Sequence, residues 1–220
     1  TLKRYKLEKN IILNKIKKEF SKKKIIIRSS ALDEDKLNNS MAGKYDSFSD
    51  LKCEKKIINK YIDLVSKKFK SNKDQILIQE YIQGADKAGV VFTRNLNNNA
   101  PYYYINYDTS GKTNLITSGA NSKDINFTVI SRFKFSINKK FKKLLSVING
   151  IEKIYSNDRL DIEFCIKNKK IYILQCRPLF SLLKTNDNEI KSMLINIEKK
   201  INKIKLNNPF LSGTTTYLSN

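Results

Sequence analysis

The chain has 220 residues, 40% of them hydrophobic, which is enough for one sizeable domain or two small lobes and excludes a disordered polymer. It carries 43 lysines and arginines against 21 acidic residues, a net charge of +22, and no histidine. The lack of histidine excludes the commonest general base and phosphoryl carrier from this chain. Any histidine chemistry must therefore come from elsewhere.

The positive charge has two explanations. It is mostly lysine, scattered along the chain beside abundant asparagine and isoleucine, which is typical of an AT-rich coding sequence. The alternative is a basic nucleic-acid-binding module, with eleven tyrosines available for base stacking. We predict no specific nucleic-acid partner.

Cysteine usage and hydropathy bear on the compartment. Cys53, Cys165 and Cys176 are widely spaced and form no CxxC pattern, which is typical of a reducing cytoplasm. Residues 1–10 lack the apolar core of a signal peptide, and no apolar run approaches the roughly 20 residues that span a bilayer. These features predict a cytoplasmic protein without a membrane partner.

The periodicity of apolar residues predicts an α+β protein and not a strict βαβ repeat. Residues 29–47 lack periodicity and read as a long loop. In chain order, the sequence predicts a helix over 5–20, a strand over 25–28, the loop, a helix from about 50 to 69, strands over 76–82, 88–93, 102–107 and 125–133, a helix over 141–151, a hairpin over 160–175, and a helix over 190–204.

The order of these elements predicts two lobes. The first covers residues 1–74 and the second, richer in strands, covers residues 75–182. A C-terminal helix follows at 183–206, and residues 207–220 read as a connector to a further domain. Small-ligand sites favour the cleft between two such lobes.

The predicted hairpin carries polar residues on one face. In a strand alternate side chains share a face, so Asp161 and Glu163 point the same way. A hairpin closed by the turn-like residues 167–170 could bring Gln175 and Arg177 opposite them. One face of an otherwise apolar hairpin then becomes polar.

These residue types suit a metal-phosphate site. Mg²⁺ prefers oxygen ligands, often one or two protein groups plus nucleotide phosphates, and a guanidinium grips phosphate oxygens with two parallel hydrogen bonds. Glu163 and Gln175 would hold the metal, and Arg177 would hold the phosphate. The alternative is a surface hairpin whose Asp161, Glu163 and Arg177 form a solvated ion pair.

Two further segments are candidates for phosphate contacts. Arg28 ends an apolar strand, where its guanidinium could clamp a phosphate or could pair with Asp33 or Asp35. Gly43 and Lys44 belong to a small-residue turn whose backbone amides could approach an anion closely. The turn is not a GxxxxGK[ST] phosphate loop.

Four blocks, taken in order, resemble the nucleotide-binding domain of phosphoenolpyruvate synthase, pyruvate phosphate dikinase and rifampin phosphotransferase. They are residues 28–35 (RSSALDED), 40–48 (SMAGKYDSF), 88–94 (AGVVFTR) and 161–178 (DIEF…LQCRP). Together they span most of the chain, from residue 25 to residue 180, and the last block is the most specific.

The resemblance implies an ATP-grasp fold, in which two lobes enclose ATP and Mg²⁺ in a cleft. By matching position, Arg28 and Arg177 would contact phosphates as catalytic residues, with Gly43 and Lys44 nearby. Glu163 and Gln175 would hold Mg²⁺, and Asp161 would orient Arg28 or a metal-bound water. The strand residues Gln79, Glu80, Tyr81 and Ile82 would lie against adenine.

The resemblance also implies a reaction. In this family a histidine on a separate swivelling domain takes a phosphoryl group from ATP, giving AMP and phosphate, and passes it to a small-molecule acceptor. Residues 104–119 and 213–220 further resemble capsule-associated members, among them an L-glutamine kinase; residues 108–113 read equally as a polar hairpin loop.

Two departures from the family pattern leave an alternative open. The chain starts beyond the place of the family's ATP-contacting lysine, and it holds no swivelling domain. We expect an incomplete first lobe, or a lysine that is absent or replaced. A degenerate, regulatory ATP-grasp domain is therefore a further alternative.

Overall fold

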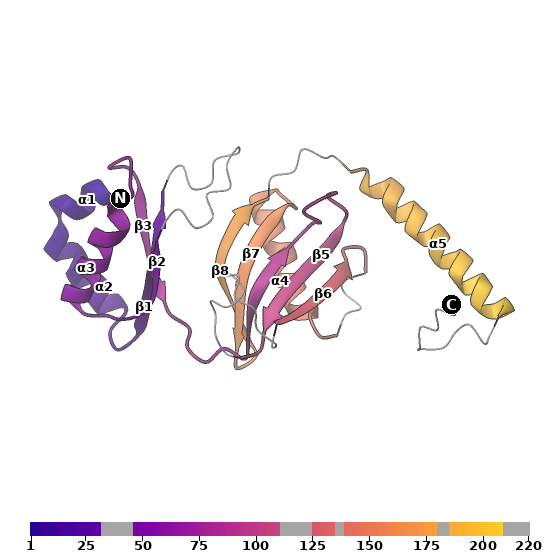
Figure 1. The fold of residues 1–220 in the computed structure, drawn as a ribbon, viewed down its shortest axis with the longest axis horizontal. Coiled ribbons are helices and arrows are strands. Elements are labelled where there is room, and N and C mark those ends of the chain that lie inside the picture. The colour runs from indigo at the N-terminus through magenta and orange to yellow at the C-terminus, as the bar shows by residue number, and fades with distance from the viewer. Residues whose placement is uncertain (32–45, 111–124, 135–138, 180–184, 209–220) are drawn as a thin grey trace, which may run out of the picture.

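The computed structural model describes residues 1–31, 46–110, 125–134, 139–179 and 185–208. Within these residues, helices accompany two antiparallel sheets (Figure 1). The elements are α1 (Leu2–Leu7), α2 (Lys9–Glu19), β1 (Lys24–Ser30), β2 (Ser47–Lys52), α3 (Lys55–Ser66), β3 (Gln75–Glu80), β4 (Lys87–Phe92), β5 (Tyr102–Asp108), β6 (Ile125–Ser131), α4 (Lys142–Tyr155), β7 (Leu160–Lys167), β8 (Lys170–Pro178) and α5 (Asp187–Asn207). The fold class is α+β, as the element order predicts.

The first sheet contains three strands in the order β2-β1-β3, with both pairs antiparallel. Ile25 and Ile27 of β1 are fully buried in a core that includes residues of α2 and α3. Because side chains alternate along a strand, Ile26, Arg28 and Ser30 belong to the opposite face. Figure 1 shows α1, α2 and α3 on one side of this sheet and the second sheet on the other.

The second sheet contains five strands in the order β6-β5-β4-β7-β8. Its main core lies between one face and α4, where the largest fully buried side chains include Tyr103, Phe141, Leu145 and Phe164. Residues that alternate with this core set, among them Glu163, lie on the other face. Strand β8 is the edge strand nearest to the first sheet (Figure 1).

The helices and strands of residues 1–66 differ from the sequence prediction in two places. The predicted helix over 5–20 is divided at Glu8 into α1 and α2. The predicted helix from about residue 50 is wrong for its first turn, because residues 47–52 form β2 and α3 begins at Lys55. Strand β2 has little intrinsic strand propensity and forms by pairing with β1, while Phe48 and Leu51 pack against the core.

The last helix, α5, runs over Asp187–Asn207, which extends the periodic stretch over 190–204 at both ends and begins after residue 183, the predicted start of the C-terminal segment. None of its side chains is buried. Strand β3 pairs with β1 and so belongs to the first sheet. The lobe boundaries at residues 74, 182 and 206 stay predictions. Among the described residues, no helix combines the length and the hydropathy needed to cross a bilayer.

Candidate functional site

The β7–β8 hairpin brings the polar residues of its two strands opposite each other. Asp161 lies opposite Arg177, and Glu163 lies opposite Gln175. The turn residues Asn168 and Lys169 both have positive φ, 51° and 62°. That backbone is the one two-residue hairpin turns require, because its twist matches that of the flanking strands. The turn pairs Lys167 with Lys170, and a shift of register further along the strands gives the two polar pairs.

A β-bulge lies beside these pairs. The register shifts between Glu163 and Phe164, whose partners are Gln175 and Ile173, so Leu174 is left without a partner on β7. The carbonyl of Leu174 instead accepts a hydrogen bond of 3.5 Å from the side-chain nitrogen of Gln79 on β3. Bulges next to functional sites re-aim side chains and free ladder groups. Here the bulge connects the hairpin to the first sheet.

Ion pairs hold the arginine of the hairpin. The Arg177 guanidinium lies 3.1 Å from an Asp161 carboxylate oxygen and 3.7 Å from one of Glu163. Both carboxylate side chains are only 16% exposed, and that of Arg177 is 31% exposed. The group is thus largely withdrawn from solvent, unlike a solvated surface ion pair. Asp161 orients Arg177, whereas the resemblance implies that it orients Arg28 or a water.

Burial and charge oppose each other at the two carboxylates. Burial raises the pKa of Glu163, and the positive charges of Arg28 and Arg177 partly offset that rise. Burial likewise raises the pKa of Asp161, against the attraction of Arg177. Arg28 acts on Glu163 although it belongs to β1 of the other sheet. The two sheets therefore share one electrostatic site.

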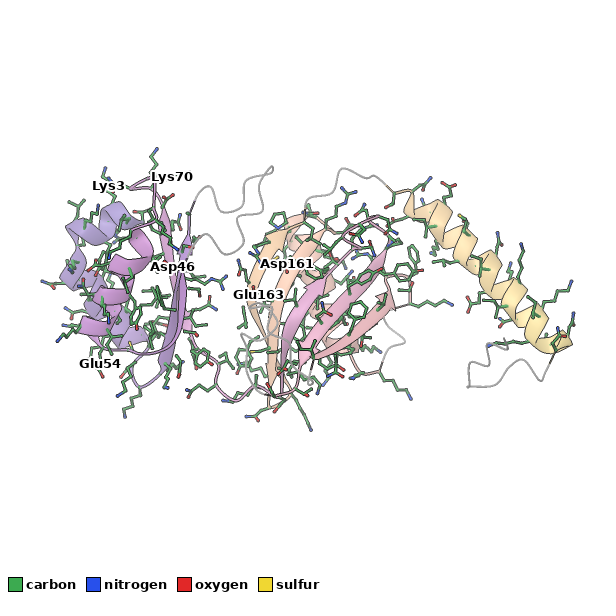
Figure 2. All side chains as sticks on the ribbon, in the orientation of Figure 1. Lys3, Asp46, Glu54, Lys70, Asp161 and Glu163 are labelled. Carbon is green, nitrogen blue, oxygen red and sulfur yellow. The ribbon has the colours of Figure 1, made fainter. Side chains whose placement is uncertain are left out.

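An open cavity of about 320 Å³ lies where the two sheets meet. Its lining includes Arg28, Ser30 and Leu77 from the first sheet, and Ile173, Gln175 and Arg177 from β8. Figure 2 shows Asp161 and Glu163 on the side of the second sheet nearer to the first. Two arginines from separate sheets thus line one cavity, together with serine hydroxyl groups and the amide of Gln175.

The predicted adenine-contacting residues lie at the end of β3. Glu80 forms an ion pair with Lys23 at 2.6 Å, and the Tyr81 backbone N–H donates to the Lys24 carbonyl at 2.8 Å. Ile82 packs against a small core cluster of the second sheet. The segment therefore joins the two sheets, and its contact with adenine stays a prediction. Gly43 and Lys44 lie outside the described residues.

The donor set fits a hard divalent cation. Glu163 supplies a carboxylate, and Gln175 directly opposite supplies an amide oxygen. A buried oxygen of Asp161, two residues before Glu163, has no hydrogen-bond partner within the described part of the chain. No cluster of three or more acidic, cysteine or histidine side chains among the described residues could hold a metal alone. Mg²⁺ needs only one or two protein ligands when phosphates supply the others.

Arg94, which ends the third sequence block, has no role in the sequence predictions. Arg94 is buried and donates to Asp158, to Asp187 at 2.8 Å and to the Asn99 carbonyl at 3.3 Å. These partners hold it in a structural network away from the cavity lining. The only sequence signal is an arginine at a strand end, which does not distinguish a ligand contact from a buried ion pair.

Sequence comparison bears directly on this arrangement. The family model described as pyruvate phosphate dikinase, AMP/ATP-binding domain, matches residues 5–125 and 105–196. The chain belongs to this family. A search of curated proteins found no match.

Membership in the family supports an ATP- or AMP-binding module of a dikinase-type phosphotransferase. The recognition from four sequence blocks is therefore confirmed at the level of the family. The family fold is of the ATP-grasp type, which agrees with α+β architecture in two antiparallel sheets.

Proposed function

We propose that the cavity between β1 and β8 binds the phosphates of Mg-ATP and presents them for phosphoryl transfer. The observation that carries the proposal is the meeting of Arg28 and Arg177, from two sheets, beside the Glu163–Gln175 pair. Phosphoryl transfer depends mainly on positioning and charge neutralisation, so this inventory suits it. The family match supports the nucleotide.

Each residue has a separate role in this proposal. Arg28 and Arg177 hold phosphate oxygens from opposite sides, and Asp161 fixes the orientation of Arg177. Glu163 and Gln175 hold Mg²⁺, which when bound neutralises charge on the phosphates. Residues 79–82, with Gly43 and Lys44, complete the nucleotide site. Burial disfavours the charged form of Glu163, and a bound cation would stabilise that form.

The same proposal extends to the whole reaction. A histidine on another domain would accept the phosphoryl group, since this chain has none. It would then pass the group to a small-molecule acceptor, and the resemblance to capsule-associated members makes L-glutamine the first acceptor to test. Alone, the chain should bind nucleotide without completing turnover.

Calorimetric titration with ATP tests the site, in the presence and absence of Mg²⁺. We expect Mg²⁺-dependent binding to the wild type and an affinity lower by about tenfold or more for Glu163→Gln, because a metal ligand is lost. Glu8→Gln, in an exposed ion pair with Arg4, is the control and should bind as the wild type does. Equal, metal-independent affinity of wild type and Glu163→Gln would reject the metal assignment.

The nucleic-acid alternative makes a different prediction. A dedicated nucleic-acid-binding module would bind single-stranded DNA or RNA tightly, with an affinity that falls steeply as salt rises. The proposed ATP site predicts only weak adhesion from the net charge of +22. Filter binding across a salt series separates the two, and tight binding at physiological salt would favour the alternative.

A further inference from the structure

Helix α5 exposes an unusual amount of apolar surface. It spans 21 residues, and none of its side chains is buried. Ile197, Ile201 and Ile204 are 48%, 46% and 53% exposed. Helices in water gain most of their stability from packing an apolar face, not from intrinsic propensity. We therefore expect the apolar side of α5 to pack against a further element and to bury more surface than it does in this structure.

The spacing of the apolar residues indicates what packs there. Ile190, Leu194, Ile197, Ile201 and Ile204 follow one another at intervals of four, three, four and three residues. This is the heptad spacing, which keeps a narrow apolar seam facing a second helix. Packing against a sheet or a globular core uses a wider apolar stripe. The regular heptad spacing favours a helix as the partner, and Ile195 adds apolar surface to the groove beside the seam.

The seam borders a groove in the structure. An open groove of about 490 Å³ lies between α5 and the end of the second sheet, with Tyr102 and Phe133 on the sheet side and Leu194, Ile197 and Ile201 on the helix side. A helix with its side chains is about 10–12 Å wide, so only one face of a partner would enter such a space. Figure 1 shows α5 leaving the sheet at an angle.

The charged residues along the edge of the groove favour one kind of partner helix over another. Lys191, Glu198 and Lys205 line the groove at seven-residue intervals, a positive, negative and positive pattern beside the seam. Lys134 adds a further positive charge and pairs with Glu198 at 2.6 Å. A second copy of α5 would bring the same lysine-rich flank, whereas acidic residues at the matching positions of a partner would be attracted.

We propose that the groove between α5 and the end of the second sheet is a docking surface for an amphipathic helix with a heptad seam and acidic flanks. The partner inserts its apolar seam between α5 and Phe133, and its acidic residues meet Lys191 and Lys205. The surface is separate from the ATP cavity, and its occupant is another domain or protein that carries such a helix.

Synthetic peptides test this proposal. Two labelled three-heptad peptides share a leucine and isoleucine seam. The acidic peptide has Glu-Lys-Glu at the flanking positions, and the basic peptide has Lys-Glu-Lys. A third peptide has the composition of the acidic one with a scrambled seam. Fluorescence anisotropy with the full chain should show about tenfold tighter binding of the acidic heptad peptide than of either other peptide. Lys191→Glu/Lys205→Glu should reverse the preference between the two heptad peptides.

Matched variants separate docking from general attraction to a basic protein. Lys199→Glu/Lys203→Glu makes the same charge change on the outer side of α5 and should leave the preference intact. Ile197→Asn should remove binding while far-UV circular dichroism stays unchanged, because its side chain is exposed. Equal binding of the three peptides, or binding of none, would overturn the proposal. Self-association through α5 in sedimentation would replace the occupant with a second copy.

Discussion

Glu163 carries a carboxylate into surroundings where burial opposes its charge. Its side chain is 16% exposed, and burial, together with the charge of Asp161, raises its pKa despite the lowering effects of Arg28 and Arg177. Functional sites often hold such unfavourable groups, because binding needs a charge that folding alone would not select. In the proposed metal site, Glu163 therefore trades stability of the empty domain for affinity for a cation.

This trade predicts an effect of Glu163→Gln on stability. A carboxyl whose folded pKa lies above its unfolded value destabilises the fold at neutral pH; the penalty shrinks as the pH falls through the folded pKa and is gone below the unfolded pKa. Without nucleotide, Glu163→Gln should therefore match the wild type or exceed it by up to about 1 kcal/mol at pH 7 in urea unfolding, with a smaller difference near pH 4. A clear loss of stability at pH 7 would contradict this view.

At the scale of elements, β4 positions the site through its place in the sheet. It lies between β5 and β7, with Val90 opposite Glu163 and Phe92 opposite Asp161. At Gly89 the neighbouring strand comes so close that a Cβ atom would stand 2.1 Å from the Asn106 carbonyl oxygen. Only glycine fits this approach, because the contact is with backbone.

Two glycines form a matched pair of predictions. Gly89→Ala forces β4 and β5 apart and should lower the free energy of unfolding by about 3 kcal/mol or more. Gly150 lies within α4, where no atom of the described residues comes within 4 Å of an added Cβ. Gly150→Ala should therefore raise stability by about 0.5–1 kcal/mol through helix propensity. Urea unfolding measures both, and similar effects of the two substitutions would contradict the predicted close approach.

At the scale of the whole molecule, Arg94 joins three distant segments. It connects the end of β4 to Asp158 before β7 and to Thr185 and Asp187 at the start of α5. The hydrogen bond from Arg94 holds the pKa of Asp187 below its ordinary value. A carboxyl with a lowered pKa stabilises the fold above its unfolded pKa, and this contribution is lost as the pH falls through the folded value.

Removing Arg94 should therefore weaken the fold in a pH-dependent way. Arg94→Ala should lower the free energy of unfolding by about 2–4 kcal/mol at pH 7, toward the low end because Asp158 and Asp187 keep partial access to water. The loss should shrink at acid pH, where Asp187 is protonated. Arg4→Ala, which breaks an exposed pair with Glu8, should cost under about 0.5 kcal/mol. Equal costs in urea unfolding would refute the structural role of Arg94.

Local sequence patterns predicted many of these elements. The features that they did not predict depend on contacts between distant segments. The helical stripes of α3, α4 and α5 and the apolar runs of the strands are properties of short segments. Strand β2 was missed because its six residues contain few apolar side chains, and its pairing with β1 makes it a strand. Arg94 received no role because its acidic partners lie 64 and 93 positions along the chain.

The sequence by itself determined which polar residues share a face within each strand of the β7–β8 hairpin, since side chains alternate along a strand. It also determined the family, because four blocks in order carry that information. Only the tertiary structure decided that β4 lies beside β7, that Leu174 bulges, and that Arg28 of β1 acts on Glu163. These features depend on packing between segments far apart in the chain, which no local periodicity encodes.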